Sequence, residues 1–190
     1  MFDYNKKTTM KTGLLYVHGL NSSSKSSKFQ TFSKYFDSSI CVEWKNGVTT
    51  IETILSDMDT GHKKLGEECA EVVIIGDSTG ANWVLQYQAL SKRSYAVSSY
   101  ALISPLLTKD SVNEPGIFEV KTWGQLQDFE KIKDLVVLYA VNDQVLNIVP
   151  HKGWQCEIHA YEGGTHKAPT DLDTMADEIL GHMETYACNR

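Results

Sequence analysis

The sequence has few cysteines and no long apolar run. Only four of its 190 residues are cysteines, and they are scattered without a CxxC pair: Cys41, Cys69, Cys156 and Cys188. This scatter argues against a paired-cysteine zinc site and against a disulfide scaffold, and it favours free thiols in a reducing cytoplasm. No segment approaches the roughly 20 consecutive apolar residues that cross a bilayer. We therefore expect a cytoplasmic protein with no membrane span.

An excess of positive charge is also missing. The formal net charge is −6, whereas proteins that bind nucleic-acid phosphates concentrate Lys and Arg. The common motifs of metal and nucleotide sites do not occur: HExxH, the P-loop, and GxGxxG after a strand. The sequence thus predicts no nucleic-acid partner, no metal and no cofactor, and it leaves the oligomeric state open.

Short runs of branched apolar residues alternate along the chain with segments of helical spacing. The runs are near-continuous, which is typical of strands buried on both faces of a parallel sheet. They lie at 13–17, 40–44, 71–75, 95–103, 135–141 and 155–161. Apolar residues at offsets of three, four and seven predict helices at 25–36, 49–65, 81–91 and 171–187. This order predicts one α/β domain over residues 1–190, with a mostly parallel sheet of about six strands flanked by helices.

The alternation is interrupted between residues 106 and 133, where the apolar periodicity is lost. The stretch contains Pro115-Gly116 and then a predicted short helix at 123–132. In α/β sheets such an excursion commonly lies over the strand ends, where ligands bind. Two interpretations stay open, a short cap over a site at the strand ends or a surface connection without a substrate role.

The strongest motif is Gly76-Asp77-Ser78-Thr79-Gly80, which directly follows an apolar run and precedes a helical segment. GxSxG at a strand-to-helix junction is the context of a nucleophile elbow, in which the serine stands on a tight, strained turn. Side chains at Gly76 and Gly80 would clash with the backbone that passes on either side. We therefore expect Ser78 to be a nucleophile.

A serine nucleophile needs a base and an acid, which in this context follow it in the order acid, then histidine. His166 lies in a loop after the last predicted strand, whereas the other histidines are less well placed: His18, His62, His151, His159 and His182. The pair Asn142-Asp143 directly follows the strand predicted at 135–141. Its carboxylate can accept the imidazole N–H and fix the tautomer. An aspartate at this place can also be a turn residue or a cap.

The segment His18-Gly19-Leu20 directly follows the first predicted strand. An HG pair at this place supplies a backbone N–H to an oxyanion hole, and here we assign that donor to Leu20. The second donor is expected to be the N–H of Thr79. We interpret His18 and Gly19 as residues that fix the loop, and a purely structural turn is the alternative.

Taken together, these motifs resemble the small bacterial YqiA-like esterases of the α/β-hydrolase superfamily. The matching stretches are LLYVHGLNSSSKSSK (Leu14–Lys28), IIGDSTGANW (Ile74–Trp83), LISPLL (Leu102–Leu107), LVVLYAVNDQVL (Leu135–Leu146) and YEGGTHKA (Tyr161–Ala168). The resemblance implies a compact α/β-hydrolase fold with little or no lid and esterase activity on short acyl esters. By motif it maps the nucleophile to Ser78, the acid to Asp143 and the base to His166.

The elbow departs from many such relatives in carrying Asp77 before the serine and Thr79 after it. A negative charge beside the nucleophile could disfavour anionic substrates or alter the environment of Ser78.

The first hypothesis is therefore a serine hydrolase, a carboxylesterase that acts on small-molecule esters through an acyl-enzyme intermediate. Trp44, Leu106 and Trp123 are candidate walls of its pocket. Two alternatives stay open. One is a binding or regulatory protein with a vestigial triad, and the other is an acyltransferase that uses the same nucleophile.

Overall fold

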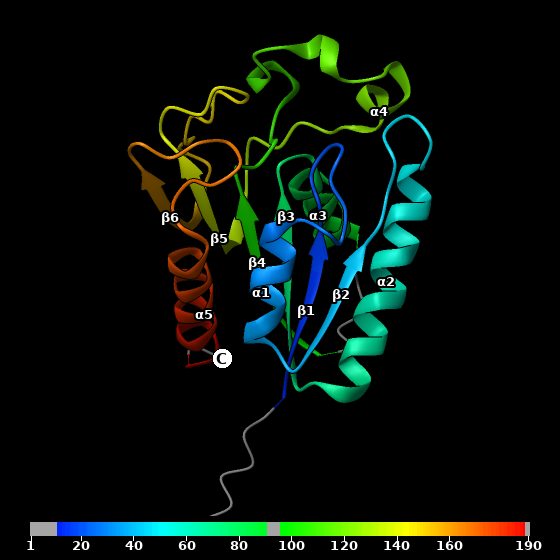
Figure 1. Ribbon diagram of the computed structural model, residues 1–190, viewed down its shortest axis with the longest axis vertical. Helices are drawn as coiled ribbons and strands as arrows, with labels where there is room; N and C mark the ends of the chain where they lie inside the picture. Colours follow the sequence, from blue (N-terminus) through cyan, green and yellow to red (C-terminus); the bar gives the residue numbers. More distant parts are fainter. Residues whose placement is uncertain (1–10, 91–95, 189–190) are drawn as a thin grey trace, which may run out of the picture.

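Six parallel strands form the centre of the molecule. The computed structural model describes residues 11–90 and 96–188. The strands are β1 (Thr12–Val17), β2 (Ser38–Val42), β3 (Glu71–Asp77), β4 (Val97–Ile103), β5 (Lys133–Ala140) and β6 (Gln155–Tyr161). They form one sheet in the order β2-β1-β3-β4-β5-β6, and every neighbouring pair is parallel (Figure 1). The predicted fold class is confirmed. The first residue of the strand predicted at 95–103 and the last of the helix predicted at 81–91 lie outside the described residues.

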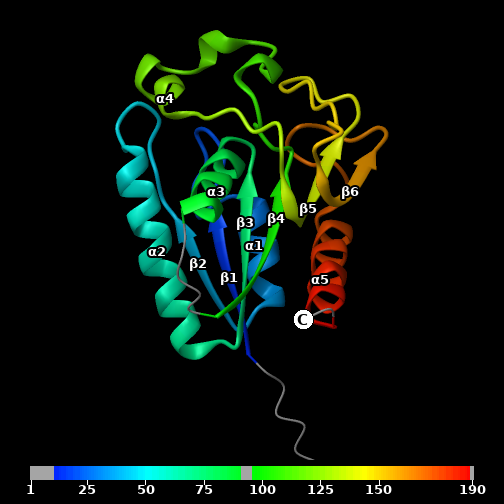
Figure 2. The same cartoon turned by 180° about the vertical axis from the view of Figure 1, so that it is seen from behind.

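Helices cover both faces of this sheet. The helices α1 (Ser27–Phe32) and α5 (Leu172–Cys188) lie on one face, and α2 (Ile51–Glu68) and α3 (Thr79–Leu90) lie on the other (Figures 1 and 2). The helix predicted at 25–36 is divided, because α1 ends at Phe32 and a 3₁₀ turn, η1 (Ser33–Tyr35), follows it. Two hydrophobic cores result, one on each side of the sheet.

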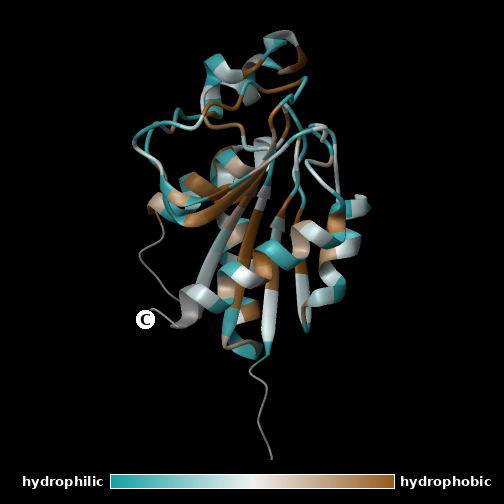
Figure 3. Ribbon diagram, turned by 90° about the vertical axis from the view of Figure 1, so that its left-hand side faces the viewer, coloured by the Kyte–Doolittle hydropathy of each residue, from teal (hydrophilic) through white to brown (hydrophobic). Residues whose placement is uncertain are grey.

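The central strands are apolar throughout because each contributes to both cores. Ile74 and Ile75 of β3 are both 0% exposed, yet Ile74 packs on the α2–α3 side and Ile75 on the α1–α5 side. Successive side chains of a strand point to opposite faces, so burial of both faces requires an unbroken apolar run. Figure 3 shows these strands as the most hydrophobic part of the interior.

The prediction of two-sided burial is wrong for β6. This strand lies at the edge of the sheet, and its residues are exposed or half-buried, with Ile158 37% exposed. An edge strand has one neighbour, here β5. The apolar run at 155–161 therefore marks a strand, but not a buried one.

The described cysteine side chains are free thiols, as predicted: Cys41, Cys69 and Cys156. The side chain of Cys188 lies outside the described residues. Within residues 11–90 and 96–188, no helix combines the length and the apolar character that a membrane crossing requires.

The segment 106–133 crosses above the carboxyl ends of the strands (Figure 1). It contains two 3₁₀ turns, η2 (Lys109–Ser111) and η3 (Pro115–Ile117), and the short helix α4 (Val120–Gln125). The segment is tied to its surroundings by an isolated bridge between Val112 and Leu146 and by a 2.7 Å hydrogen bond from the Gly47 amide to the Thr122 hydroxyl.

The helix predicted at 123–132 is wrong beyond Gln125. Leu126, Phe129 and Ile132 have helical spacing, but residues 126–132 have no helical structure. The buried side chain of Asn82 takes the place of helical hydrogen bonds, because it donates to the Gln127 carbonyl (2.8 Å) and accepts from the Gln127 amide (3.1 Å). A polar side chain on α3 therefore satisfies backbone groups that a helix would otherwise pair internally.

We expect Ile75→Ala to lower the free energy of unfolding by about 2–5 kcal/mol, because it removes a fully buried side chain from the central strand. The matched control is Val149→Ala, which truncates a side chain that is 66% exposed and should change that free energy by less than about 0.5 kcal/mol. Urea denaturation measures both values. Equal effects of the two substitutions would contradict the position of β3 in the core.

Candidate active site

Ser78 stands on a strained turn between β3 and α3. Its φ angle is 52°, in the left-handed region that non-glycine residues rarely adopt. The neighbouring strand stabilises this conformation, since the Ser78 amide donates to the Ile103 carbonyl at 2.8 Å. The Ser78 carbonyl in turn accepts from the amides of Ala81 (3.0 Å) and Leu106 (3.1 Å). Both backbone polar groups of the strained residue are thus paired.

The glycines of the elbow are required by close packing. A Cβ at Gly76 would lie 2.5 Å from the Cα of Ala81. A Cβ at Gly80 would overlap the carbonyl oxygen of Val17 and lie 2.6 Å from that of His18. A Cβ at Gly19 would lie 3.1 Å from the Cβ of Ser78. The loop after β1 therefore packs directly against the elbow, as the steric interpretation of the motif predicts.

Ser78, His166 and Asp143 form one chain of hydrogen bonds. The Oγ of Ser78 lies 2.9 Å from the Nε2 of His166, and the Nδ1 of His166 lies 2.8 Å from the Oδ2 of Asp143. An ionised carboxylate can only accept, so Nδ1 must carry the hydrogen. The Nε2 atom is then the acceptor that faces the serine hydroxyl. The three loops that carry these residues follow β3, β5 and β6 and meet at the carboxyl edge of the sheet (Figure 1).

The carboxylate of Asp143 is held on both of its oxygens. While Oδ2 faces His166, Oδ1 accepts from the amides of Val145 (2.8 Å) and Leu146 (2.9 Å). Burial alone would raise the pKa of Asp143, but the hydrogen bonds from His166 and the two amides outweigh it and lower this pKa. Asp143 is thus ionised at neutral pH. Its bonds to Val145 and Leu146 also make it a turn residue, so both interpretations of its position apply.

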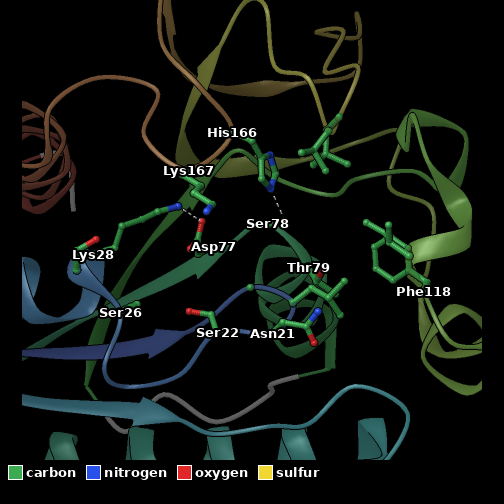
Figure 4. Close-up of a pocket in the computed structure, with 16 residues that line it drawn as sticks. Asn21, Ser22, Ser26, Lys28, Asp77, Ser78, Thr79, Phe118, His166 and Lys167 are labelled. Atoms are coloured by element: carbon green, nitrogen blue, oxygen red, sulfur yellow. Dashed lines mark hydrogen bonds and ion pairs between the residues drawn. The ribbon is translucent and has the colours of Figure 1, made fainter.

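Ser78 and His166 line a cavity of about 420 Å³ (Figure 4). The walls come from the loop after β1, the start of α1, the elbow, the loops after β5 and β6, and the segment 106–133, which contributes Ile117 and Phe118. That segment is therefore in contact with the space in front of the serine.

Both predicted oxyanion donors belong to this cavity. Leu20 and Thr79 line it together with Ser78. Thr79 is the first residue of α3, so its amide is one of those that a helix leaves unpaired. Among the described residues, neither the Leu20 nor the Thr79 amide has a hydrogen-bond acceptor.

His18 is buried beneath the cavity floor and does not join the hydrogen-bond chain of Ser78. Its ring stacks on Trp44, with the centroids 5.4 Å apart and an interplanar angle of 8°. Its Nε2 accepts from the Trp44 amide (3.2 Å), its Nδ1 donates to the Gly19 carbonyl (2.8 Å), and its carbonyl accepts from the Trp44 indole (2.8 Å). These contacts fix the loop that carries Leu20.

The three residues that were expected to line the pocket do not line the cavity. Trp44 and Leu106 are core residues, 5% and 1% exposed, and Trp123 packs behind Phe118 with ring centroids 5.3 Å apart. None of the three lines the cavity. Large apolar side chains at these positions indicated burial, but they did not indicate whether the side chains are buried in the core or in the wall of the cavity.

The structure contains a buried ion pair beside the serine that the sequence did not predict. The ammonium of Lys28 on α1 pairs with the Oδ1 of Asp77, and the Tyr16 hydroxyl donates to the Oδ2 of Asp77 at 3.1 Å. Lys28 is 8% exposed and Asp77 6%. Burial, followed by the negative charge of Asp77, raises the pKa of Tyr16 well above its usual value, so the phenol keeps its proton. The one signal in the sequence was Asp77 itself, because a carboxylate that is buried in the elbow requires a cation close to it.

Metal ligation has no evident place in the described part of the chain. No group of three His, Cys, Asp or Glu side chains there is placed to share an ion.

Comparison with known proteins places the fold. No protein-family model matches the sequence, and neither does any curated protein sequence. Several solved structures are similar. Est1E from Butyrivibrio proteoclasticus has a TM-score of 0.66 at 12% identity, over 94% of this chain and 89% of that one. A structure described under LipS and LipT, two metagenome-derived lipolytic enzymes, has a TM-score of 0.65 at 16% identity, over 93% and 94%.

A third similar structure has no lid. XC6422 from Xanthomonas campestris, described as an α/β serine hydrolase without lid, has a TM-score of 0.62 at 9% identity, over 95% of this chain and 85% of that one. Identities this low establish architecture and not activity. The chain therefore has the α/β-hydrolase fold.

We expect Gly80→Ala to lower the free energy of unfolding by about 1–3 kcal/mol, because the added methyl group would overlap two carbonyl oxygens. Gly181→Ala is the matched control. Gly181 also lies in a helix, α5, but nothing lies within 4 Å of an added Cβ, so the substitution should raise the free energy by up to about 1 kcal/mol. Thermal or urea denaturation measures both. A Gly80→Ala protein as stable as Gly181→Ala would refute the close approach of the two loops.

Proposed function

We propose that the protein is a serine esterase that hydrolyses small carboxylic esters, with Ser78 as nucleophile, His166 as general base and Asp143 as its orienting acid. The observation that carries the proposal is the continuous hydrogen-bond chain from Asp143 to Ser78, which ends at a cavity. A strained serine, a histidine in the correct tautomer and an ionised aspartate are the three requirements of this chemistry.

In the first half-reaction the Oγ of Ser78 attacks the ester carbonyl carbon while its proton passes to the Nε2 of His166. The imidazolium is stabilised by the Asp143 carboxylate. As the tetrahedral intermediate collapses, the bond to the alcohol oxygen breaks and His166 returns the proton to that oxygen. Water then attacks the acyl-serine by the same route, the acid is released and the serine hydroxyl is restored.

The negative charge of each tetrahedral intermediate needs donors on the opposite side of the reacting carbon. We assign this role to the backbone amides of Leu20 and Thr79, which line the cavity and have no acceptor among the described residues. Loss of one such donor typically reduces turnover about 100- to 1,000-fold. The close packing of Gly19 against Ser78 supports the placement of the Leu20 amide near the reacting carbon.

Small esters are favoured by the size of the cavity. A volume of about 420 Å³ is at the lower end of the range for ligand pockets. The segment 106–133 contributes only Ile117 and Phe118 to the walls, which suits a short cap. Two of the similar structures are described as a lipolytic enzyme and as a serine hydrolase without lid, which supports an ester substrate and a short cap. The motif resemblance to the YqiA-like esterases also supports small esters.

We expect a fluorophosphonate probe to label the protein at one serine and Ser78→Ala to abolish the labelling. The same substitution should reduce ester turnover about a millionfold, because the residues of a triad act as a unit. Intact-protein mass spectrometry and hydrolysis of a chromogenic butanoate ester measure the two effects. An unlabelled, folded wild-type protein would instead support a binding protein with a vestigial triad, and full turnover by Ser78→Ala would refute the proposal.

We expect Asp143→Asn to reduce kcat about 10,000-fold, because an amide cannot stabilise the imidazolium and can reverse the tautomer of His166. Asp134→Asn is the control, since it makes the same change to an exposed aspartate at the opposite end of β5 and should leave kcat unaltered. Steady-state kinetics with the same ester measures both. A kcat for Asp143→Asn within tenfold of the wild type would remove Asp143 from the mechanism.

A further inference from the structure

The cavity in front of Ser78 has one polar and one apolar side. Figure 4 shows Lys28, Asp77 and Lys167 on one side of Ser78 and Phe118 on the other. Serine hydroxyls from the loop after β1, at Ser22 and Ser26, extend the polar lining. Ile117, Val145 and Leu146 are further apolar residues of the lining, and Asn21 is a polar residue that Figure 4 places between Ser22 and Phe118. A ligand that fills this cavity therefore has to present different chemistry to its two sides.

The polar side carries a positive balance of charge. Asp77 is the only acidic residue among the described residues that line the cavity, and its two oxygens are taken by Lys28 and Tyr16. Its charge is thus compensated within the protein. The Lys28 ammonium has three hydrogens, and Asp77 is its one acceptor among the described residues. The expectation that Asp77 would disfavour anionic substrates does not follow once this ion pair is taken into account.

Lys167 adds a cation that has no carboxylate partner among the described residues. It is exposed, lines the cavity and directly follows His166. A tight turn fixes its backbone, because the Thr165 amide donates to the Ala168 carbonyl (2.9 Å) and the Ala168 amide donates to the Thr165 carbonyl (3.1 Å). The same turn holds His166 toward Ser78. One turn therefore fixes the backbone of both Lys167 and His166, and the Lys167 side chain leaves it into the lining of the cavity.

The position of His166 indicates which half of an ester lies on the polar side. In the proposed mechanism, Nε2 returns its proton to the oxygen of the leaving alcohol, so that oxygen must lie within hydrogen-bond reach of the imidazole. The leaving group is thus next to the turn that carries Lys167. The oxyanion is directed toward Leu20 and Thr79. The acyl chain then occupies the apolar side, at Phe118 and Leu146.

We propose that the protein prefers esters whose alcohol half carries an anionic group, a carboxylate or a phosphate, which Lys167 and Lys28 bind while a short acyl chain fills the apolar side. This substrate class rests on the proposed esterase function. A protein with a net charge of −6 repels anions at long range. At the cavity, Lys167 favours such a group locally, against this average field, because it has no carboxylate partner among the described residues. Lys28, whose charge is offset by Asp77, adds hydrogen-bond donors.

The test compares pairs of esters in which one member carries an anionic group and the other is neutral. The carboxylate pair is 3-carboxyphenyl butanoate and 3-carbamoylphenyl butanoate. The phosphate pair is 1-butanoylglycerol 3-phosphate and 1-butanoylglycerol. A third pair places the charge on the acyl side, as the phenyl monoesters of glutarate and of its monoamide. For each pair, the ratio of kcat/KM for the charged ester to that for the neutral ester is measured in the wild type and in variants, so intrinsic reactivity cancels between proteins.

We expect the wild type to favour at least one of the two esters with an anionic alcohol half. Lys167→Gln should lower that ratio about fivefold at low ionic strength, a modest value because the lysine is exposed and screened by salt. Lys167→Arg should retain the preference and Lys167→Glu should reverse it. Lys64→Gln is the matched control, since it removes one positive charge from the solvent side of α2, near the opposite edge of the sheet, and should leave the ratio unaltered.

The outcomes separate the preference from the esterase function itself. Turnover of the neutral esters with ratios near one, or ratios that Lys167→Gln leaves unaltered, would overturn the anion preference while the esterase proposal stands. A preference confined to the glutarate pair would overturn the assignment of the alcohol half to the polar side. Absence of turnover for every ester would overturn both proposals. The pair that responds to Lys167→Gln identifies the anion as a carboxylate or a phosphate.

Discussion

The site depends on the close approach of two backbones at the elbow. The start of α3 packs so tightly against the end of β1 that Gly80 cannot carry a side chain, and it turns so closely over the end of β3 that Gly76 cannot carry one either. This packing, together with hydrogen bonds to Ile103 and Leu106, holds Ser78 at a φ of 52°, a conformation that costs on the order of 1–3 kcal/mol when it is unsupported. The strain is confined to Ser78, but the packing and hydrogen bonds that stabilise it come from neighbouring parts of the fold. Consequently Ser78, the proposed nucleophile, is held in place by the fold itself.

Residues whose positions follow from local sterics or from strand order could be predicted from the sequence. The glycines of the elbow follow from the tight turn, and Asp143 and His166 follow from the rule that loops after parallel strands meet at one edge of the sheet. The structure brings these residues within hydrogen-bond distance of one another, 88 positions apart in the case of Ser78 and His166. An apolar run before a glycine-rich turn, with a helical segment after it, indicates where such a site lies, since strand order and crossover handedness leave few alternatives.

Features that depend on contacts between distant side chains could not be predicted in this way. The sequence predicted a short helix at 123–132, but beyond Gln125 the buried amide of Asn82 satisfies the backbone groups of Gln127 in a non-helical path. The run at 155–161 favoured a buried strand, but burial of β6 depends on its place at the edge of the sheet. The Lys28–Asp77 pair joins α1 to the elbow across many residues and leaves no periodic signal.

That ion pair links the stability of the fold to the chemistry of the cavity. Removal of one member of a buried pair leaves an uncompensated charge, at a cost of about 3–5 kcal/mol, so Lys28 and Asp77 constrain each other. Because Lys28 is on α1, the pair also holds this helix, and the hydroxyl-rich loop that precedes it, against the elbow. The Lys28–Asp77 part of the polar side is therefore placed as firmly as Ser78. In the proposed mechanism an uncompensated Asp77 would oppose the developing oxyanion, and its pairing with Lys28 and Tyr16 removes that opposition while keeping these side chains in position.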